Sequence, residues 1–238
     1  MSVPHMALSE NQLRAIARQA RAFWDAQVSN KGFLEITRGK EIGHRIADYV
    51  DDHTTALLKV KFDTRYEADG KGESRKRSMG DVWLHGGGVL NPVNVKAGLQ
   101  DMNGQPNLVS MQKLLDYILH RWIDSYYLLI VKFSLGDPVQ HKIALVDMLD
   151  WLDFIVYDAG PGQIMLRERD FFLAWDSGNK PRVRTMVEKV ELLFGRFEAG
   201  VDSLICNRKE RLRRQRKLFE DFGDRKFEVD QSGLVFVP

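Results

Sequence analysis

Apolar residues recur every three or four positions in four parts of the chain, which is the spacing of amphipathic helices. Residues 9–28 come first, with Ser9 as a suitable N-cap, and residues 38–52 form a second such segment. Residues 106–123 carry an apolar stripe and begin with a proline, which favours the first turn of a helix. Residues 182–222 form the last segment and include a dense basic block. The pattern therefore predicts four helices, the last of them long.

Between these segments the pattern changes to alternating apolar and polar residues or to continuous β-branched runs, both typical of strands. The segments of this kind are 57–68, 81–85, 89–96, 125–135, 139–149 and 153–172. Three glycines, Gly86 to Gly88, join 81–85 to 89–96, and glycine permits the positive φ angles of a tight reversal. We therefore expect an antiparallel hairpin there, and a second hairpin turned at residues 160–162.

The order of these elements predicts an α+β fold, in which a central mixed β-sheet is flanked by helices and followed by a long C-terminal helix. We expect one domain over residues 1–238. Its parts would be a helical N-terminal part at about 8–53, a sheet core at about 55–170 and a helical C-terminal part at about 181–223.

The amino-acid composition is that of a globular protein and argues against membrane-spanning and disulfide-bonded classes. The 238 residues are 44% hydrophobic and 29% charged, which is ordinary for a globular chain. No apolar run approaches the length of about 18 residues that a transmembrane helix needs, and the first residues do not resemble a secretory signal. The single cysteine, Cys206, excludes an intramolecular disulfide and a cysteine-based zinc site. These features predict a cytoplasmic, bacterial protein without a membrane partner.

Positive charge is concentrated locally, although the net charge of the chain is only +2. Residues 208–217, RKERLRRQRK, hold seven basic residues and one acid. A second cluster, formed by Arg75, Lys76 and Arg77, precedes the glycine hairpin. Local basic patches favour contact with nucleic-acid phosphates, and both clusters are candidates for DNA binding. For 208–217 the alternative is an ordinary solvated helix face.

The glycine hairpin also carries candidate chemistry, because Asp81 begins its first strand and Lys96 ends its second. A carboxylate beside a lysine suits metal-assisted phosphodiester hydrolysis: the carboxylate holds Mg²⁺, and the lysine orients a water and offsets developing charge. The alternative is a cross-strand ion pair, which contributes about 0–1 kcal/mol when exposed. The apolar neighbours favour partial burial: Val82, Trp83, Leu84, Val93 and Val95.

The order Asp81, twelve residues, Asn94-Val95-Lys96 resembles the PD-(D/E)xK nuclease motif, in particular that of type II restriction endonucleases. The resemblance covers about residues 35–135. It implies a restriction-endonuclease-like fold, with the motif on adjacent strands of a mixed sheet. It also implies a Mg²⁺-dependent, sequence-specific endonuclease acting on double-stranded DNA, and a homodimer that cuts a palindromic site symmetrically.

Residue by residue, the resemblance gives Asp81 the role of metal ligand and Lys96 that of positioning the attacking water. Asn94 stands where the family has Asp or Glu, and its amide oxygen would be a neutral metal ligand. Glu41, on the predicted preceding helix, would be an auxiliary catalytic acid. The alternatives are that Asn94 is only a hydrogen-bonding residue and that Glu41 is solvated.

Gln105, Asn107 and Ser110 fall at the predicted start of the helix that follows the motif. Backbone N–H groups and small polar side chains at a helix N-terminus suit a DNA phosphate, whereas the alternative is ordinary capping. Three further interpretations of the chain stay open: a monomeric repair or nicking nuclease, a DNA-binding protein with a weakened or inactive site, and an interaction protein without a DNA role.

Overall fold

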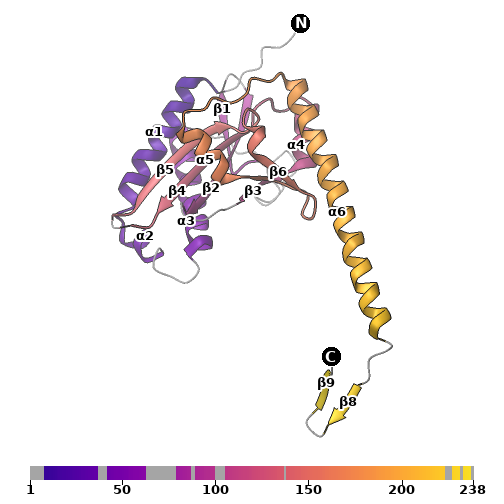
Figure 1. Cartoon of the computed structure of the whole chain (residues 1–238). Coiled ribbons are helices and arrows are strands. Elements are labelled where there is room, and N and C mark those ends of the chain that lie inside the picture. The colour runs from indigo at the N-terminus through magenta and orange to yellow at the C-terminus, as the bar shows by residue number, and fades with distance from the viewer. Residues whose placement is uncertain are drawn as a thin grey trace.

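A four-stranded mixed sheet lies at the centre of the fold in the computed structural model (Figure 1). Its strands, in spatial order, are β1 (Val82–Gly86), β2 (Val89–Leu99), β4 (Tyr127–Ser134) and β5 (Gln140–Asp147). The central pair β2 and β4 is parallel, and both outer pairs are antiparallel. The structure describes residues 8–36, 42–62, 79–86, 89–99, 105–136, 138–222, 227–230 and 233–236. The predicted α+β class, mixed sheet and glycine hairpin are confirmed.

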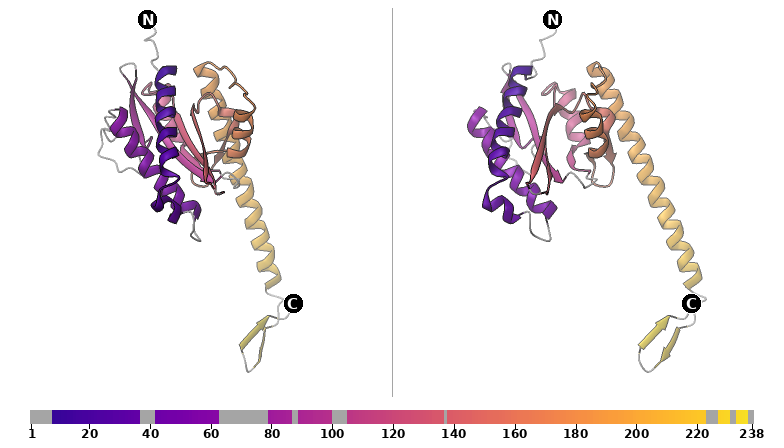
Figure 2. Two further views of the ribbon diagram at one scale, coloured as in Figure 1. Left: turned by 90° about the vertical axis from the view of Figure 1, so that its left-hand side faces the viewer. Right: turned by 60° about the vertical axis from the view of Figure 1, so that its left-hand side comes forward.

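Three helices cover one face of this sheet: α1 (Glu10–Gln27), α2 (Lys31–Ile36) and α3 (Ile42–Phe62) (Figure 2). The predicted cap of α1 is confirmed, since Ser9 and Gln12 form a reciprocal capping box. An aromatic cluster joins the helices to the sheet, with the ring of Phe133 5.2 Å from Trp24 and 5.0 Å from Phe33. Burial of these large rings fixes the helices on this face.

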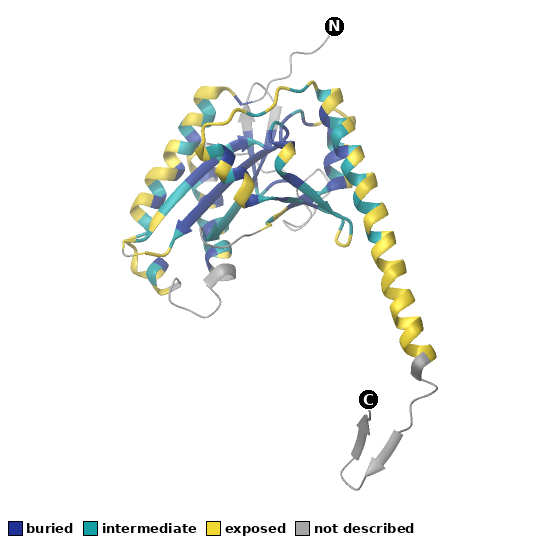
Figure 3. Cartoon of the chain, in the orientation of Figure 1, coloured by how far each residue is buried: buried dark blue, intermediate teal, exposed yellow. Residues whose placement is uncertain are grey.

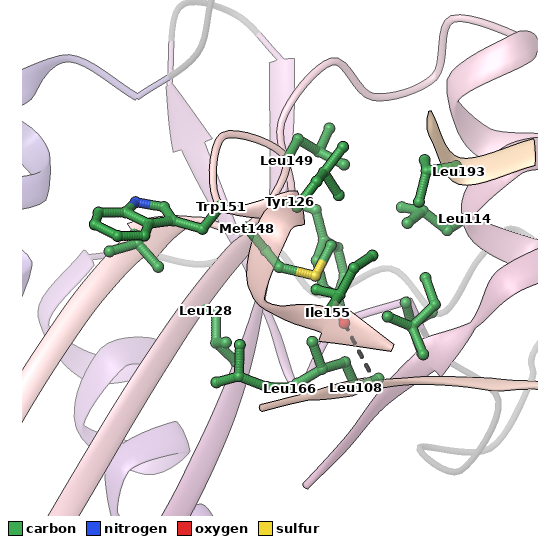
Figure 4. Close-up of a cluster of buried hydrophobic side chains, with 14 of the residues drawn as sticks. Leu108, Leu114, Tyr126, Leu128, Met148, Leu149, Trp151, Ile155, Leu166 and Leu193 are labelled. Carbon is green, nitrogen blue, oxygen red and sulfur yellow. Dashed lines mark hydrogen bonds between the residues drawn. The ribbon is translucent and has the colours of Figure 1, made fainter. Parts of the chain in front are cut away.

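The opposite face is covered by a second, three-stranded sheet and by further helices. The strands are β3 (Asn107–Ser110), β7 (Gln163–Leu166) and β6 (Ile155–Asp158), and the helices are α4 (Met111–Leu119), the 3-10 helix η2 (Leu152–Phe154), α5 (Glu168–Asp176) and α6 (Met186–Phe222). Their apolar side chains form one core with the central sheet, and Tyr126 lies within it (Figure 4). The predicted hairpin of β6 and β7 is confirmed.

One predicted strand is wrong. Residues 57–62 belong to α3, and residues 63–68 lie outside the described part of the chain. Four buried residues of α3 recur every four positions: Ile46, Val50, Thr54 and Leu58. Thr54 can occupy this apolar row because its hydroxyl accepts a hydrogen bond from Trp24 Nε1 at 3.2 Å. The row of buried residues therefore includes a polar residue. The sequence pattern at this position does not look like a continuous apolar stripe of a helix.

The helix predicted over residues 106–123 is shorter than expected, since residues 107–110 form β3 and α4 begins at Met111. β3 pairs with β7, more than 50 residues later in the chain, and this non-local pairing overrides the local helical pattern. The short helices α2 and α5 were not predicted. The long C-terminal helix is confirmed as α6, and the hairpin of β8 (Phe227–Asp230) and β9 (Gly233–Phe236) follows it. In the described part of the chain no helix is long and apolar enough to cross a membrane.

The carboxyl group of Asp147, at the end of β5, gives the fold a predictable pH dependence. Its Oδ1 accepts backbone hydrogen bonds from Tyr126 at 3.1 Å and Leu149 at 3.0 Å. Burial raises the pKa of this carboxyl to about 6, so the folded state binds the proton more tightly than the unfolded state. The contribution of this carboxyl to the free energy of unfolding is therefore greatest below about pH 4, and it is lost as the pH rises through about 6.

We expect Asp147→Asn to be more stable than the wild type at pH 7.5 by about 1–2 kcal/mol, because the amide oxygen still accepts both bonds and carries no charge. The expected gain is smaller than the full pKa shift implies, because Asp147 is only half-buried. Urea unfolding at pH 4.5 and 7.5 measures the effect. An equal difference between the two proteins at both pH values would contradict this assignment.

Candidate active site on the central sheet

Asp81, Asn94 and Lys96 lie together at one end of the β1–β2 hairpin. Asp81 directly precedes β1, and the register in which Val82 faces Val93 places Asp81 beside Asn94. Asn94 and Lys96 are two residues apart in β2, so their side chains share a face of the sheet. It is the face toward the three-stranded sheet, because the Asn94 side chain bonds to Leu108 and Tyr126. The structure thus brings the three motif residues onto neighbouring strand positions.

Asp81 forms hydrogen bonds to the backbone of β2 at the end of the hairpin away from its turn. The Asp81 amide donates to the Val93 carbonyl at 2.9 Å, and Asp81 Oδ2 accepts from the Val95 amide at 2.7 Å. Asp81 Oδ1 makes no hydrogen bond to any described residue, and Asp81 and Lys96 form no ion pair with each other. One carboxylate oxygen is therefore held by the backbone, while the other remains for a further ligand.

Asn94 is only 5% exposed, and its amide group is held in one orientation. Its Nδ2 donates to the Leu108 carbonyl at 2.9 Å and to the Tyr126 hydroxyl oxygen at 2.9 Å. A carbonyl oxygen can only accept, so the nitrogen of the amide must face Leu108. Asn94 Oδ1 is then directed away from both groups, and it is buried without a hydrogen-bond partner among the described residues. Such an acceptor costs about 1–3 kcal/mol unless something binds it.

Tyr126, directly before β4, completes this arrangement. It is fully buried, and its hydroxyl reaches the Leu108 carbonyl at 3.5 Å (Figure 4). Burial raises the pKa of the Tyr126 hydroxyl, and the nearby negative charge of Asp81 raises it further. The phenol therefore stays protonated and close to the Asp81 carboxylate. In the sequence Tyr126 looks like a core aromatic residue, and no spacing links it to Asn94.

Lys96 is half-buried beside Ile130 of β4. Within the residues that the structure describes, its ammonium group forms no hydrogen bond or ion pair. A half-buried lysine without a carboxylate partner among the described residues is available to pair with an incoming anion. This differs from the structural alternative, in which Lys96 would neutralise Asp81 across the hairpin.

A buried ion pair lies farther along the same face of β2. Lys132 Nζ lies 2.7 Å from Glu168 Oε2 and donates to the Leu99 carbonyl at 2.9 Å, and both side chains are almost fully buried. Gly98, opposite Lys132, leaves the space for this pair, since a Cβ there would lie 3.1 Å from Glu168 Oε1. Burial raises the pKa of Glu168 despite its bond to Lys132. No local pattern in the sequence predicts this pair.

The structure describes only some of the other predicted site residues. Glu41, Arg75, Lys76 and Arg77 lie outside the described residues. Gln105 and Asn107 are exposed before and within β3, so their predicted place at a helix N-terminus is wrong. Ser110 is the N-cap of α4, where its hydroxyl accepts from the Lys113 amide at 3.4 Å. The capping alternative therefore describes Ser110.

Asp81 Oδ1 and Asn94 Oδ1 are the type of ligand that Mg²⁺ prefers, because this hard cation binds oxygen and keeps several waters. The orphaned Asn94 oxygen fits such a cation better than it fits the apolar core around it. Across the described ranges, no three His, Cys, Asp or Glu side chains are grouped so that they could hold a metal ion. A cation here would thus depend on one acid, one amide oxygen and water.

Comparison with known proteins gives no further assignment. No protein-family model matches the sequence, and no curated protein is significantly similar to it. Functional inference therefore depends on the motif and on the geometry around it.

The contact between Tyr126 and Asn94 can be tested by its effect on stability. We expect Tyr126→Phe to lower the free energy of unfolding by about 1–2 kcal/mol, because one Asn94 N–H is left buried without an acceptor. Urea unfolding of this variant, of Asn94→Ala and of the double variant measures the coupling between the two side chains. Strictly additive effects would show that the pair does not act together. Tyr157→Phe is the control, since that half-buried hydroxyl has no hydrogen bond within the described chain.

Proposed function

We propose that this protein is a Mg²⁺-dependent endonuclease that hydrolyses phosphodiester bonds of double-stranded DNA at specific sites. The observation that carries the proposal is the combination at the end of the β1–β2 hairpin. There, on or directly beside two adjacent strands, lie a carboxylate, an oriented amide and a lysine. Among the described residues, one oxygen of the carboxylate, the amide oxygen and the lysine have no partner. Their order in the chain is that of the PD-(D/E)xK motif, with Asn94 in place of the second acid.

Each residue has a defined part in this proposal. Asp81 and Asn94 would hold Mg²⁺, which when bound polarises a phosphate oxygen and lowers the pKa of a bound water. Tyr126 and the Leu108 carbonyl hold the Asn94 nitrogen, which would leave the Asn94 oxygen available to that cation. The Lys96 ammonium orients the attacking water and offsets the negative charge that develops on the phosphate. Glu41 stays a proposed auxiliary acid.

The partners follow from the same proposal. Double-stranded DNA would be bound by basic segments, among them residues 75–77 and 208–217. Symmetric cleavage of a palindromic site requires two copies, so we propose a homodimer. A restriction enzyme acts where foreign DNA enters the cell, which agrees with the bacterial cytoplasm as its proposed location.

Incubation of the purified protein with plasmid and phage DNA, in Mg²⁺ and in EDTA, tests the proposal. Discrete fragments that form only with Mg²⁺ would support a site-specific endonuclease. A smear or nicked circles would indicate a non-specific or nicking nuclease, and the oligomeric state would then separate a monomeric repair enzyme from a dimer.

A second candidate is favoured by Asn94 itself, because a neutral ligand gives a weaker cation site than the carboxylate that the motif normally has. In that case the protein would be a DNA-binding protein with a weakened or inactive nuclease site. DNA that is bound but left intact in Mg²⁺ and in Mn²⁺ would support this second candidate over the first.

A further inference from the structure

The far part of α6 has no packing partner in the described structure. Near its start α6 packs on the body, where Leu193 is buried, Lys189 pairs with Asp150 and Phe197 contacts Tyr157. From residue 205 to residue 220 every side chain is exposed, and the helix projects away from the four-stranded and three-stranded sheets (Figure 3). We call residues 205–220 the α6 arm. Its sixteen residues span about 24 Å, or about seven base pairs of duplex DNA.

The α6 arm carries a charge that its own acids do not neutralise. Residues 208–217 hold seven basic residues and one acid, a net charge of +6. Glu210 pairs with Arg213 and Arg214, and Glu220 pairs with Arg216. Four cations of the arm have no acidic partner within the described chain: Arg208, Lys209, Arg211 and Lys217. Close like charges on one helix repel, so an opposing polyanion would stabilise the arm.

A second copy of the arm is a poorer partner than a polyanion. Ile205, Leu212 and Phe219 are seven residues apart and exposed, which places them in one row on the helix. If these three residues occupy position a of a coiled-coil heptad, Arg208 occupies position d, in the same seam. The flanking positions carry Lys209, Arg211 and Arg216. Two such helices side by side would set Arg211 of one against Arg216 of the other, so like charges would face each other where coiled coils place ion pairs.

We propose that the α6 arm binds the phosphate backbone of duplex DNA outside the segment that lies at the catalytic sheet. This inference rests on the proposed function for its choice of polyanion, and it adds a contact that is separate from the hydrolytic site. The arm then acts as a sequence-independent clamp, and DNA affinity depends on whether the duplex is long enough to reach it.

The test replaces the four unpaired cations together: Arg208→Gln, Lys209→Gln, Arg211→Gln and Lys217→Gln. Glutamine keeps the helix propensity, and the sites are exposed, so the fold is preserved. Affinity for 12- and 30-base-pair duplexes is measured by fluorescence anisotropy in EDTA over a range of KCl. Loss of four phosphate contacts should make the slope of log K against log[KCl] shallower by about 3–4 and weaken binding of the long duplex at least about tenfold.

A matched control removes the same number of exposed cations from the N-terminal helices, on the other side of the molecule: Arg14→Gln, Arg18→Gln, Arg21→Gln and Lys31→Gln. The proposal expects this control to keep the salt slope and the preference for the long duplex. Equal losses in both variants, or wild-type binding by the arm variant, would overturn it.

Two further outcomes separate this inference from the proposed function. Normal cleavage and binding by the arm variant would overturn the clamp and leave the nuclease proposal standing. Arm-dependent DNA binding by a wild-type protein that never cuts would support the clamp and count against the nuclease. Conversion of a dimer to a monomer in the arm variant, by sedimentation without DNA, would show that the arm pairs two copies and overturn the proposal.

Discussion

Lys96→Ala is expected to lower the rate of DNA cleavage at saturating Mg²⁺ by about 10²–10³-fold, the usual effect of removing one preorganised charge from a hydrolytic site. Lys96 lies two residues after Asn94 in β2, and among the described residues no acid pairs with it and neutralises its charge. Initial rates on a plasmid substrate measure the effect. Circular dichroism and urea unfolding check that the variant folds, since Lys96 makes no bond within the described chain that its loss would break.

Lys142→Ala is the matched control for this experiment. Lys142 stands on the same face of the sheet, opposite Lys132, and its partly exposed ion pair with Asp176 contributes about 0–1 kcal/mol. We expect this control to cleave at the wild-type rate. If Lys96→Ala also cleaved within about twofold of the wild type, Lys96 would have no part in the reaction.

Lys132→Met should produce the largest loss of stability, about 3–5 kcal/mol, because it leaves the Glu168 carboxylate buried without its counter-charge. The pair is 7% and 3% exposed, and Glu168 Oε1 already lacks a partner among the described residues, so solvent cannot offset the charge. Urea unfolding at pH 8 measures this loss. Lys142→Met, at the partly exposed pair, should change stability by less than about 1 kcal/mol.

The same variant has a pH dependence that distinguishes lost charge pairing from lost packing. Burial already holds the pKa of Glu168 above its ordinary value, and removal of Lys132 raises it further. The carboxyl is then neutral in the folded state at low pH, so the stability deficit of Lys132→Met should shrink from pH 8 to pH 5. The double variant Lys132→Met/Glu168→Leu should recover most of the deficit, since an apolar pair can replace a buried ion pair. A pH-independent deficit would assign the loss to packing.

Local patterns predicted the elements whose signals are continuous in the sequence. The capping box at Ser9, the glycines between β1 and β2 and the β-branched runs of β4 each specify a local structure by themselves. The misassigned segments depend on distant partners. Thr54 fits the buried row of α3 only because Trp24 bonds to it, and β3 is a strand only because β7 lies beside it.

In the candidate site, too, residues with local spacing were predicted and their distant partners were not. The spacing of Asp81, Asn94 and Lys96 predicted neighbouring positions on a hairpin, because antiparallel pairing across a short turn fixes which residues face each other. The groups that orient Asn94 come from 14 and 32 residues farther along the chain, and no spacing rule connects them. The Lys132–Glu168 pair is also non-local, which is why two buried charges were missed.

The dependence of the cleavage rate on Mg²⁺ concentration, measured for the wild type and for Asn94→Asp, tests the central claim most directly. If Asp81 and Asn94 share a cation, the added negative charge should lower the Mg²⁺ concentration that gives half-maximal cleavage, the Mg²⁺ midpoint, by about tenfold. Without metal the new carboxylate weakens the fold, because one of its oxygens faces the Leu108 carbonyl. Damage to the fold alone would raise the midpoint or lower the maximal rate. Wild-type protein that never cuts DNA in Mg²⁺, or a folded variant with an unchanged midpoint, would contradict the proposed site.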